Sequence, residues 1–267
     1  MSLRAAVIGA AGFLGAAIDQ GMRRAGHTVV PILRGQPLPQ DRFDVVVDCA
    51  GDSRRFFCNT HPRHAFDANV SPVLDRVTGI DHGLYVLAST IDVYGAGKAS
   101  PAASREDALI RTRDLDGYSF TKALAEQVAE RHATRALILR LGTLIGPGLR
   151  KNPVFDILNG QPLRNSDTSS LSLVDTRFDV QALLSLLNAG TAGIVNVTGN
   201  GPVRTADILS LAQRHRPDLP ISFHAEREDF HYDVAVDKLA ACVAVPNGLD
   251  MLDRYMAEQF GEGHGRA

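Results

Sequence analysis

A tyrosine and a lysine stand four residues apart in the segment DGYSFTKALAEQ. Positions i and i+4 share one face of a helix, so Tyr118 and Lys122 would lie side by side in the helix that this segment predicts. A free phenol has a pKa of about 10, and a nearby cation lowers it by favouring the phenolate. The pair is therefore suited to exchange a proton with a substrate oxygen, although the same spacing also occurs on ordinary helix surfaces.

A hydroxyl that bonds the same substrate oxygen would complete such a site. The segment LASTIDVYG supplies Ser89 and Thr90 where an apolar run ends. That run predicts a buried strand, and open α/β sheets bind ligands at the carboxyl ends of their strands. The tyrosine, the lysine and a hydroxyl together form a stronger pattern than any of them alone.

A glycine-rich turn stands near the N-terminus, in VIGAAGFLGAAI. Gly9 would permit the tight turn, Gly12 would let a pyrophosphate approach the backbone, and Gly15 would let the helix pack on the strand. Phe13 and Leu14 belong to the same loop, and the helix that starts there offers free N–H groups to phosphates. Glycines also mark plain strand-to-helix turns, but this position favours dinucleotide binding.

The side chain at the end of the second predicted strand indicates whether NAD(H) or NADP(H) binds. NAD sites usually place a carboxylate there for the ribose 2′-hydroxyl. This chain reads VVPILRG, with Arg34 at the strand end and no carboxylate. A guanidinium can bind a 2′-phosphate, so the sequence favours NADP(H) over NAD(H), although Arg34 also fits a solvated loop residue. Pro31 removes one ladder donor and should lie near the end of a strand that we expect inside the sheet.

Apolar runs and helical patterns alternate through the first two-thirds of the chain. Leu14, Ile18 and Met22 recur every four residues, and Gly26 is placed to end their helix. The runs that predict buried strands are 5–8, 28–33, 45–48, 84–88 and 136–141. Strands separated by helices imply an α/β fold, a Rossmann doubly wound parallel sheet.

The residue pattern changes after residue 148, where the sequence becomes polar and predicts loops. Later segments predict one more strand at 193–198 and helices at 205–215 and near the C-terminus. We therefore expect a Rossmann domain over 1–148, to which 173–198 returns. A small substrate-binding portion would comprise 149–172 and 199–267.

Composition restricts the class of protein. The 267 residues carry a formal charge of −2, so no basic field would attract nucleic acid or anionic lipid. No apolar run approaches the roughly 20 residues that span a bilayer, and we expect no membrane segment and no signal peptide. Three cysteines at wide spacing fit reduced thiols and a cytoplasmic location. The histidine pair at 61–64 lacks partners at metal-site spacing, so we expect no metal.

These motifs together resemble the extended short-chain dehydrogenases/reductases, over nearly the whole chain. GAAGFLG is similar to the opening fingerprint of that family and YSFTK to its YxxxK motif. STIDVYG resembles S-[ST]-x-x-V-Y-G, which implies that Thr90, not Ser89, is the catalytic hydroxyl. By the same resemblance Tyr118 would exchange the proton, while Lys122 would bind the cofactor ribose and lower the pKa of Tyr118.

The resemblance also implies cofactor residues after the third strand. DVVVDCAG stands where the family often has H-x-A-A, so Asp48, Ala50 and Gly51 would line the adenosine side through backbone contacts. Asn69 in DANV stands at the position of the family's helix asparagine. Asp48 replaces the usual histidine there, which is a departure from the family pattern.

Substrate residues follow from LRLGTLIGPG, which is similar to the family segment after the fifth strand. The next residues include Asn152, which would bind the diphosphate of a nucleotide sugar, and Arg177 is a second candidate. Both also fit ordinary solvated surface residues.

The resemblance implies an NAD(P)-dependent enzyme acting on a nucleotide-activated sugar, by 4-ketoreduction or epimerisation. The short stretch 35–44 resembles the dTDP-4-dehydrorhamnose reductases more than the 4-epimerases. A dehydratase would carry an acidic pair directly after the catalytic threonine, whereas this chain has Ile91 and Asp92, so we rank dehydration last. The alternative is a non-catalytic NAD(P)-binding redox sensor or regulatory protein of the same fold, a group that typically lacks the tyrosine or the lysine.

The resemblance further implies a homodimer, because the family commonly pairs two helices from each subunit. The segments 62–77 and 117–132 would supply these helices. Val70, Leu74 and Val77 would form one outward apolar stripe, unless these residues only cover the sheet.

Overall fold

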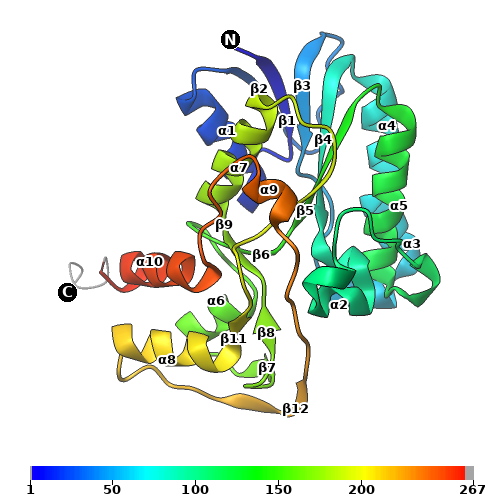
Figure 1. Ribbon diagram of the computed structural model, residues 1–267. Coiled ribbons are helices and arrows are strands. Elements are labelled where there is room, and N and C mark those ends of the chain that lie inside the picture. Colours follow the sequence, from blue (N-terminus) through cyan, green and yellow to red (C-terminus); the bar gives the residue numbers. More distant parts are fainter. Residues whose placement is uncertain (1, 262–267) are drawn as a thin grey trace.

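The computed structural model describes residues 2–261 and places a six-stranded parallel sheet at the centre of the molecule (Figure 1). The strand order is β10-β5-β4-β3-β1-β2. These strands are β1 (Arg4–Ile8), β2 (Thr28–Ile32), β3 (Phe43–Asp48), β4 (His82–Thr90), β5 (Ala136–Leu141) and β10 (Gly193–Val197). The sheet confirms the predicted α/β class, and several small two-stranded sheets accompany it.

The strand β2 lies at the edge of the sheet, which corrects the expectation that it is an interior strand. Only a short stretch separates β2 from β3, and β3 pairs with β1 rather than adding a strand outside β2. Pro31 is exposed and pairs with Val7 on its inner side only. The missing N–H of a proline is tolerated on an edge strand, and Pro31 is the next-to-last residue of β2, near the strand end as predicted.

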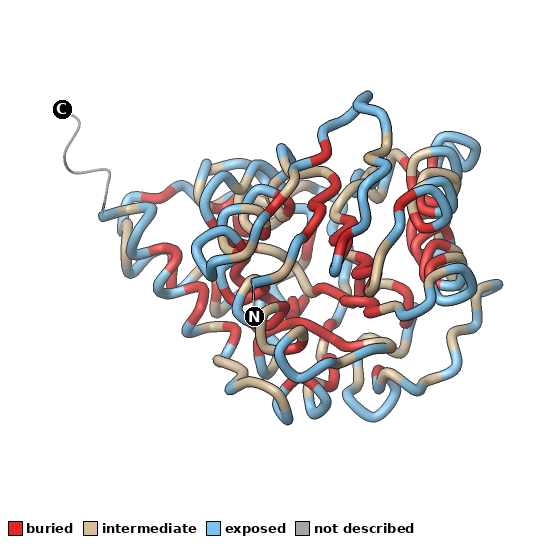
Figure 2. The backbone as a smooth tube through the Cα atoms, turned by 90° about the horizontal axis from the view of Figure 1, so that it is seen from above, coloured by how far each residue is buried: buried red, intermediate tan, exposed pale blue. Residues whose placement is uncertain are grey.

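Helices cover both faces of the sheet because successive side chains of each strand point to opposite faces. On β1, Ala5 and Val7 join one apolar cluster, and Ala6 and Ile8 join the other. The first cluster includes residues of α1 (Phe13–Arg24) and α7 (Thr176–Asn188). The second includes residues of α4 (Ser71–Gly79) and α5 (Gly117–His132). Figure 2 shows the buried backbone concentrated between these layers.

Local signals explain where the two helices nearest the expected site begin and end. The α1 helix buries Ile18 and Met22, as predicted, and Gly26 follows it with a φ of +86°. The α5 helix begins after Asp116, whose carboxylate accepts a 2.8 Å hydrogen bond from the backbone N–H of Ser119. This N-cap sets the position of Tyr118 in the first turn.

Short elements connect the main sheet to the helices around it. Two helices, α2 (Arg55–Thr60) and α3 (Pro62–Asn69), lie between β3 and α4 and pack on α5. Three 3₁₀ segments follow β4, namely η1 (Ile91–Ala99), η2 (Pro101–Ala103) and η3 (Thr112–Asp114). Thus α2, α3 and η1 surround the beginning of α5.

Most of the remaining elements lie below the sheet in the view of Figure 1, whereas α9 (Asp237–Ala240) packs on β10. The remaining elements are β6 (Thr143–Ile145), α6 (Pro153–Leu158), β7 (Leu163–Asn165), β8 (Ser170–Leu171), β9 (Leu173–Asp175), β11 (Val203–Arg204), α8 (Thr205–His215), β12 (Phe223–Glu228), α9 and α10 (Gly248–Gly261). The small sheets pair β6 with β9, β7 with β12, and β8 with β11. The division into two domains at the predicted residues stays a prediction.

The outward apolar stripe predicted for a dimer is wrong in two of its three residues. Val70 and Val77 are only 5% and 3% exposed, because they pack inside the chain, whereas Leu74 is 40% exposed. None of the helices among residues 2–261 combines the length and apolar character needed to cross a membrane. Within the same residues no group of three or more metal-binding side chains comes together.

Candidate active site

Thr90 is the last residue of β4, at the carboxyl end of the strand. The two hydroxyls there point apart, as the alternation of a strand requires. Ser89 is buried and donates to the carboxylate of Glu126 on α5. Thr90 instead donates to Asp92 Oδ2 over 3.3 Å and accepts from the backbone N–H of Asp92 over 3.2 Å.

Tyr118 lies in the first turn of α5, next to the short helix α2. Its backbone N–H donates to Asn59 Oδ1 over 2.8 Å, and its side chain packs in a small buried cluster with Cys58 and Ala65. The phenol is nearly buried, and its hydroxyl makes no hydrogen bond to another residue of 2–261. The ring of Tyr118 is therefore fixed by packing, while its hydroxyl remains able to form a hydrogen bond with a ligand.

Lys122 follows one turn later on α5 and is buried. Its ammonium donates to the carbonyl oxygen of Ala88 on β4 over 2.7 Å. Burial lowers the pKa of Lys122, and the nearby carboxylates of Asp48 and Glu126 oppose that change. The lysine thus ties the helix that carries Tyr118 to the strand that carries Thr90.

The pKa of Tyr118 is raised, whereas the sequence predicted that Lys122 lowers it. Burial raises the pKa of Tyr118 well above its usual range, and the negative charge of Asp92 raises it further. The guanidinium of Arg55 opposes this change. The ammonium of Lys122 is instead bonded to the carbonyl oxygen of Ala88.

Arg55 is a site residue that the sequence did not indicate. It begins α2, and its guanidinium donates to Asp116 Oδ2 over 2.7 Å. The same Asp116 carboxylate caps α5 through Ser119, so one side chain positions both Arg55 and the turn that carries Tyr118. Burial lowers the pKa of Arg55, but the carboxylates of Asp92 and Asp116 outweigh it and raise that pKa.

The carboxylate of Asp92, which bonds Thr90, also accepts hydrogen bonds from residues of distant segments. Its Oδ1 accepts a 2.6 Å hydrogen bond from the hydroxyl of Tyr232 and a 3.1 Å bond from the ammonium of Lys98. Lys98 also donates to the Tyr232 oxygen over 3.1 Å. Tyr232 lies 140 positions after Asp92, in the C-terminal part, and no local pattern could have linked them.

The glycine loop has the geometry that close backbone approach requires. Gly9 has a φ of +77°, which favours glycine. A Cβ on Gly15 would lie 2.1 Å from the carbonyl oxygen of Gly9, so only glycine fits there. Gly12 caps the twelve-residue helix α1, and Phe13 and Leu14 in its first turn are half-buried. This turn at the carboxyl edge fits a dinucleotide pyrophosphate, which the free N–H groups would bind.

The loop after β3 is built around two buried polar side chains. Asp48 is fully buried, bonded to Arg76 at 3.1 Å and to the hydroxyl of Tyr85 at 2.6 Å. Asn69 Oδ1 accepts from the backbone N–H of Asp52 over 2.8 Å, and its amide donates back to the carbonyl of Asp52 over 3.2 Å.

These contacts place the predicted adenosine-side residues behind the loop. A Cβ on Gly51 would meet Asn69 Oδ1 at 2.8 Å, so Asn69 supports the loop closely. The side chains of Asp48 and Asn69 are therefore structural, and a cofactor would meet this loop at the backbone of Ala50 and Gly51. Contact of these four residues with a cofactor stays a prediction.

Arg34 lies in the turn after β2, next to the edge of the sheet. Its side chain is exposed and forms no ion pair or hydrogen bond within residues 2–261. The guanidinium is therefore available to a 2′-phosphate. Its contact with a cofactor stays a prediction.

The predicted substrate residues are engaged by the chain itself. Asn152, which has a φ of +114°, caps α6 through Phe155 and donates to the carbonyl of Leu144 over 2.8 Å. Arg177 pairs with Asp175 and with Glu258, at 2.5 and 2.7 Å. Each would have to release these partners to bind a diphosphate, and both roles stay predictions.

Lys151 bridges two loops that follow different strands. Its ammonium donates to the carbonyl and the hydroxyl of Ser53 over 2.9 and 2.7 Å. Ser53 follows the β3 loop and immediately precedes the α2 region, whereas Lys151 precedes α6. Burial lowers the pKa of Lys151.

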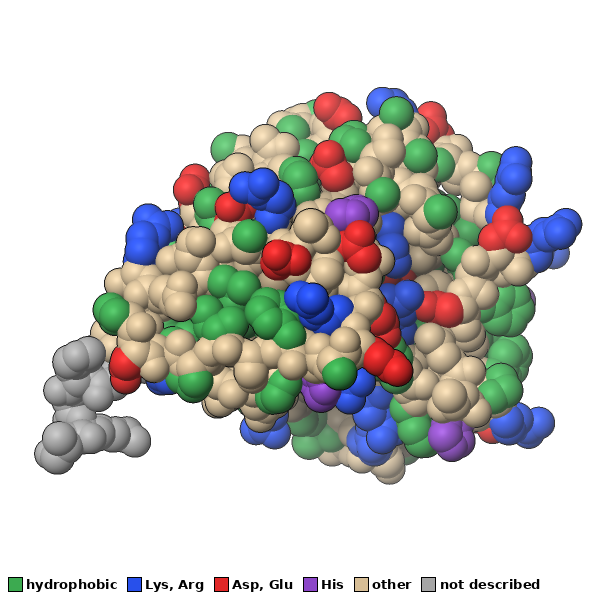
Figure 3. All heavy atoms as spheres, turned by 90° about the horizontal axis from the view of Figure 1, so that it is seen from below, with side chains coloured by type: hydrophobic (Ala, Val, Ile, Leu, Met, Phe, Trp, Pro, Cys, Tyr) green, Lys and Arg blue, Asp and Glu red, His purple; other side chains and the backbone are tan. Residues whose placement is uncertain are grey.

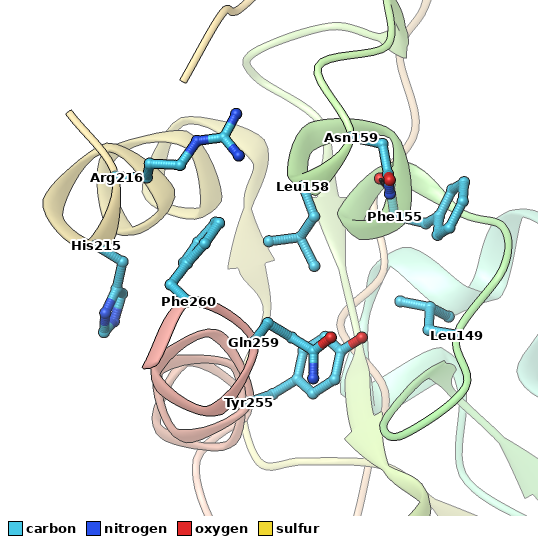
Figure 4. Close-up of a pocket in the computed structure, with 9 residues that line it drawn as sticks. All are labelled: Leu149, Phe155, Leu158, Asn159, His215, Arg216, Tyr255, Gln259 and Phe260. Atoms are coloured by element: carbon cyan, nitrogen blue, oxygen red, sulfur yellow. Dashed lines mark hydrogen bonds between the residues drawn. The ribbon is translucent and has the colours of Figure 1, made fainter. Parts of the chain in front are cut away.

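One surface pocket of about 450 Å³ lies away from these residues, between α6, α8 and α10 (Figure 4). Leu158, Tyr255 and Phe260 point toward one another in it. Figure 3 shows a group of apolar side chains on one part of the face in view, while side chains of both charges spread over the rest of that face. None of the predicted site residues lines this pocket.

The fold and the site define a dinucleotide-binding α/β protein with a tyrosine, a lysine and a threonine at the carboxyl edge of its sheet. The model of the NAD dependent epimerase/dehydratase family matches residues 5–157, more than half of the 267. The chain therefore belongs to that family. This confirms the resemblance drawn from the motifs.

The chain is also similar to two relatives and to several solved structures. The chain is 25% identical over 239 residues to the Epimerase family proteins Mb2239 of Mycobacterium bovis and MT2273 of Mycobacterium tuberculosis, covering 77% of this chain and 76% of theirs. Among solved structures, TunA, an NAD-dependent NDP-hexosamine 5,6-dehydratase, is 18% identical with a TM-score of 0.84 over 99% of this chain and 98% of its own. MoeE5 in complex with UDP-glucose and NAD is 20% identical with a TM-score of 0.80 over 96% and 99%. Likeness at this level of identity establishes the fold.

Proposed function

We propose that this protein is an NAD(P)-dependent enzyme that interconverts a hydroxyl and a keto group on a nucleotide-activated sugar, in an epimerisation or a 4-ketoreduction. The observation that carries this proposal is the linkage at the end of β4. Lys122 bonds Ala88, and Thr90 follows two residues later. Asp92 accepts a hydrogen bond from Thr90, and its charge raises the pKa of Tyr118.

Each side chain has a distinct role in this proposal. A nicotinamide bound on the glycine loop supplies the hydride acceptor or donor. Tyr118 gives a proton to the sugar oxygen or takes one from it, and Thr90 bonds the same oxygen and orients it. Lys122 holds the end of β4 and provides a buried cation for the ribose.

The cofactor preference that we propose is for NADP(H). Arg34 is exposed and unpaired within the described residues, and no carboxylate stands directly after β2. A carboxylate at this place would repel a 2′-phosphate, whereas a guanidinium can bind it. MoeE5 has been solved with NAD, so the preference of this chain needs a direct measurement.

The substrate class rests on the family and on the cations beside the site. Arg55 and Lys151 reach the site from α2 and from the loop before α6. Asn152 and Arg177 are our proposed diphosphate residues, once released from their partners. MoeE5 binds UDP-glucose and UDP-glucuronic acid, which makes uridine diphosphate sugars the first probes to try.

We also propose a homodimer, formed through α3, α4 and α5. Phe66, Leu74 and Phe120 are 42%, 40% and 38% exposed on these three helices, which is unusual for large apolar side chains. Light scattering at micromolar concentration should give twice the mass of one chain. A monomer at that concentration would remove this part of the proposal.

The enzyme assignment is tested by identifying the nucleotide that purifies with the protein, followed by two screens. In one, uridine and thymidine diphosphate sugars are incubated with NAD⁺ or NADP⁺, and in the other 4-keto nucleotide sugars are incubated with NADH or NADPH. The expected result is turnover of at least one sugar by the wild type and none by Tyr118→Phe. Tight cofactor binding without turnover of any sugar would favour a sensor.

A further inference from the structure

Two carboxylates lie near the phenol of Tyr118. Asp116 stands two residues before it, as the N-cap of α5, and Asp92 lies in the first turn of η1. Burial raises the pKa of Tyr118, and the negative charges of Asp92 and Asp116 raise it further, because each disfavours a phenolate. A cation beside the phenol is therefore needed if Tyr118 is to give up its proton readily.

Arg55 is paired with one of these carboxylates and is an electrostatic neighbour of the other. Its Nε and Nη2 atoms both lie 2.7 Å from Asp116 Oδ2. Burial lowers the pKa of Arg55, whereas the charges of Asp92 and Asp116 raise it. The guanidinium is 36% exposed, and its Nη1 atom forms no hydrogen bond to residues 2–261. Asp116 thus holds Arg55 without using all of its donors.

The short helix α2, which begins with Arg55, is fixed to the first turn of α5. Asn59 Oδ1 accepts a 2.8 Å hydrogen bond from the backbone N–H of Tyr118. Gly117 allows the two helices to approach closely, because a Cβ there would lie 3.3 Å from the Cα of Asn59. Asp116 caps the same turn while it pairs with Arg55. These contacts keep the guanidinium at a fixed place relative to the turn that carries Tyr118.

Proton transfer from Tyr118 leaves a negative charge in this site. When the phenol gives its proton to a sugar oxygen, the phenol O–H bond breaks, an O–H bond forms on the sugar, and the electron pair stays on the phenol oxygen. Little water can solvate that phenolate, because Tyr118 is only 9% exposed. A positive charge that is already in place stabilises such a developing charge without reorganisation.

We propose that Arg55 is a positioning residue of the active site, held by Asp116 so that its guanidinium stabilises the phenolate of Tyr118 against the nearby carboxylates. This rests on the proposed function, in which Tyr118 exchanges the proton with the sugar, and adds a second cation to that site. Arg55 acts through the charge on Tyr118 and needs no contact with the reacting atoms of the sugar.

The ionisable groups around Tyr118 come from η1, α2, α5 and the C-terminal part. They are Asp92 of η1, Cys58 of α2, Asp116 and Lys122 of α5 with its N-cap, and Tyr232 as a neighbour of Arg55. All of them stay in the chain when only Arg55 is replaced, so a change in the titration of Tyr118 then reports the loss of the guanidinium.

The protonation of Tyr118 can be measured without any substrate. The five tyrosines are labelled by expression with 3,5-difluorotyrosine, whose phenol is more acidic than that of tyrosine, so that titration falls where the chain stays folded. The fluorine NMR signal of residue 118 is identified by its absence in Tyr118→Phe. Its chemical shift against pH gives the pKa of this phenol in each variant.

Arg55→Gln should raise the pKa of the labelled Tyr118 by about one unit, because an opposite charge near the phenol is lost. Arg55→Lys keeps a cation and should recover most of that change. A merely structural role of Arg55 predicts the opposite sign, because a loosened turn admits water and lowers the pKa of a buried phenol. A pKa of Tyr118 that falls or stays unchanged in Arg55→Gln would overturn the proposal.

Two control variants separate the charge from the packing of α2. Asn59→Ala removes a hydrogen bond to the turn of Tyr118 but leaves every charge in place. Arg54→Gln removes the neighbouring arginine, whose side chain is 59% exposed and pairs with Asp52. Neither control should raise the pKa of Tyr118 by more than about 0.3 units, because exposed charges are screened by solvent and salt. A rise in either control equal to that in Arg55→Gln would also overturn the proposal.

A double variant keeps the proposal testable should Arg55→Gln fail to fold. Arg55→Gln combined with Asp116→Asn leaves no unpaired charge, and asparagine is also a favoured N-cap. The reference is Asp116→Asn alone, so the difference between the two isolates the charge of Arg55. The pKa of Tyr118 should be higher in the double variant by about one unit, and equal values would overturn the proposal.

Turnover provides a second measurement, with UDP-glucose and NAD⁺ or NADP⁺ as the first probe. Oxidation requires a phenolate that accepts the proton, so Arg55→Gln should lower kcat at neutral pH by about tenfold, the effect of one pKa unit. The pH at which the rate rises should move upward with the pKa measured by NMR. KM for the sugar should stay within about threefold of wild type. A raised KM with an unmoved pH profile would mean that Arg55 binds the sugar instead, and would overturn the proposal.

Failure of the proposed function can be told apart from failure of this inference. Were no sugar turned over by the wild type, the proposed function would fail. The fluorine titration needs neither sugar nor cofactor, so it would still decide whether Arg55 stabilises the phenolate of Tyr118.

Discussion

The ammonium of Lys122 donates a 2.7 Å hydrogen bond to the carbonyl oxygen of Ala88, two residues before Thr90 on β4. One bond thus joins the helix of the proposed proton donor to the strand of the proposed orienting hydroxyl. Lys122 is only 7% exposed, and burial lowers its pKa. This lysine has a structural task beside any contact with a cofactor, whereas Tyr118 has none of this kind through its hydroxyl.

We predict that Tyr118→Phe abolishes turnover while cofactor affinity stays nearly unchanged, because the glycine loop holds the pyrophosphate. Lys122→Met should weaken turnover and cofactor affinity together. It should also reduce the free energy of unfolding by about 1–3 kcal/mol, since the carbonyl of Ala88 loses its partner. Cofactor titration and urea unfolding of both variants provide the measurements. Equal loss of cofactor affinity in the two variants would contradict this division of roles.

For Arg34 we predict a role in choosing the cofactor. Its exposed guanidinium should make NADPH bind more tightly than NADH by about one to two decades, the effect of a charge-assisted pair. Arg34→Asp should reverse the preference, because a carboxylate repels phosphate and accepts from a free 2′-hydroxyl. Arg24, an exposed arginine of the last turn of α1, provides a control as Arg24→Asp. A wild type that already prefers NADH would show that Arg34 is a solvated loop residue.

The buried pair of Glu126 and Arg140 should be critical for stability. The two side chains are 3% and 2% exposed and approach to 2.7 Å, and Ser89 also donates to Glu126. Removing one partner of a buried pair leaves an uncompensated charge, so Glu126→Gln should cost about 3–5 kcal/mol. The exposed pair of Arg42 and Asp81 serves as the control, and Arg42→Gln should cost less than about 1 kcal/mol. Chemical denaturation of both variants measures the free energy of unfolding. Similar small losses of this free energy in both variants would contradict the prediction.

The raised pKa of Tyr118 predicts a loss of stability in alkaline solution. The folded chain holds the phenolic proton above pH 10, where an unfolded tyrosine releases it. Its stabilising contribution is therefore complete below about pH 10 and is lost as the pH rises further, by up to about 1.4 kcal/mol per pH unit. Lys122 acts in the opposite sense, because its pKa is lowered by burial and stability rises with pH as it loses its proton.

Urea unfolding at a series of pH values between 8 and 11 tests this linkage. The free energy of unfolding of the wild type should fall more steeply above about pH 10 than that of Tyr118→Phe, which lacks the titrating hydroxyl. Parallel curves for the two proteins would show that the phenol titrates alike in the folded and unfolded chains.

The sequence by itself determined the features that depend on near neighbours. The spacing of Gly9, Gly12 and Gly15 predicted the strand-to-helix turn, because only a glycine fits where a Cβ would clash. Alternating apolar runs predicted the parallel sheet, and the family motif separated Thr90 from Ser89. A strand turns successive side chains to opposite faces, so the structure could place Ser89 against Glu126 and Thr90 beside Asp92.

Only the tertiary structure decided which charged side chains lie near Thr90 and Tyr118. Arg55 reaches Asp116 across 61 positions, and Tyr232 reaches Asp92 across 140. The i to i+4 spacing predicted that Lys122 lowers the pKa of Tyr118, but burial and Asp92 raise that pKa instead. Spacing fixes which residues share a helix face, whereas a pKa depends on the solvent excluded and the charges brought close by the whole fold.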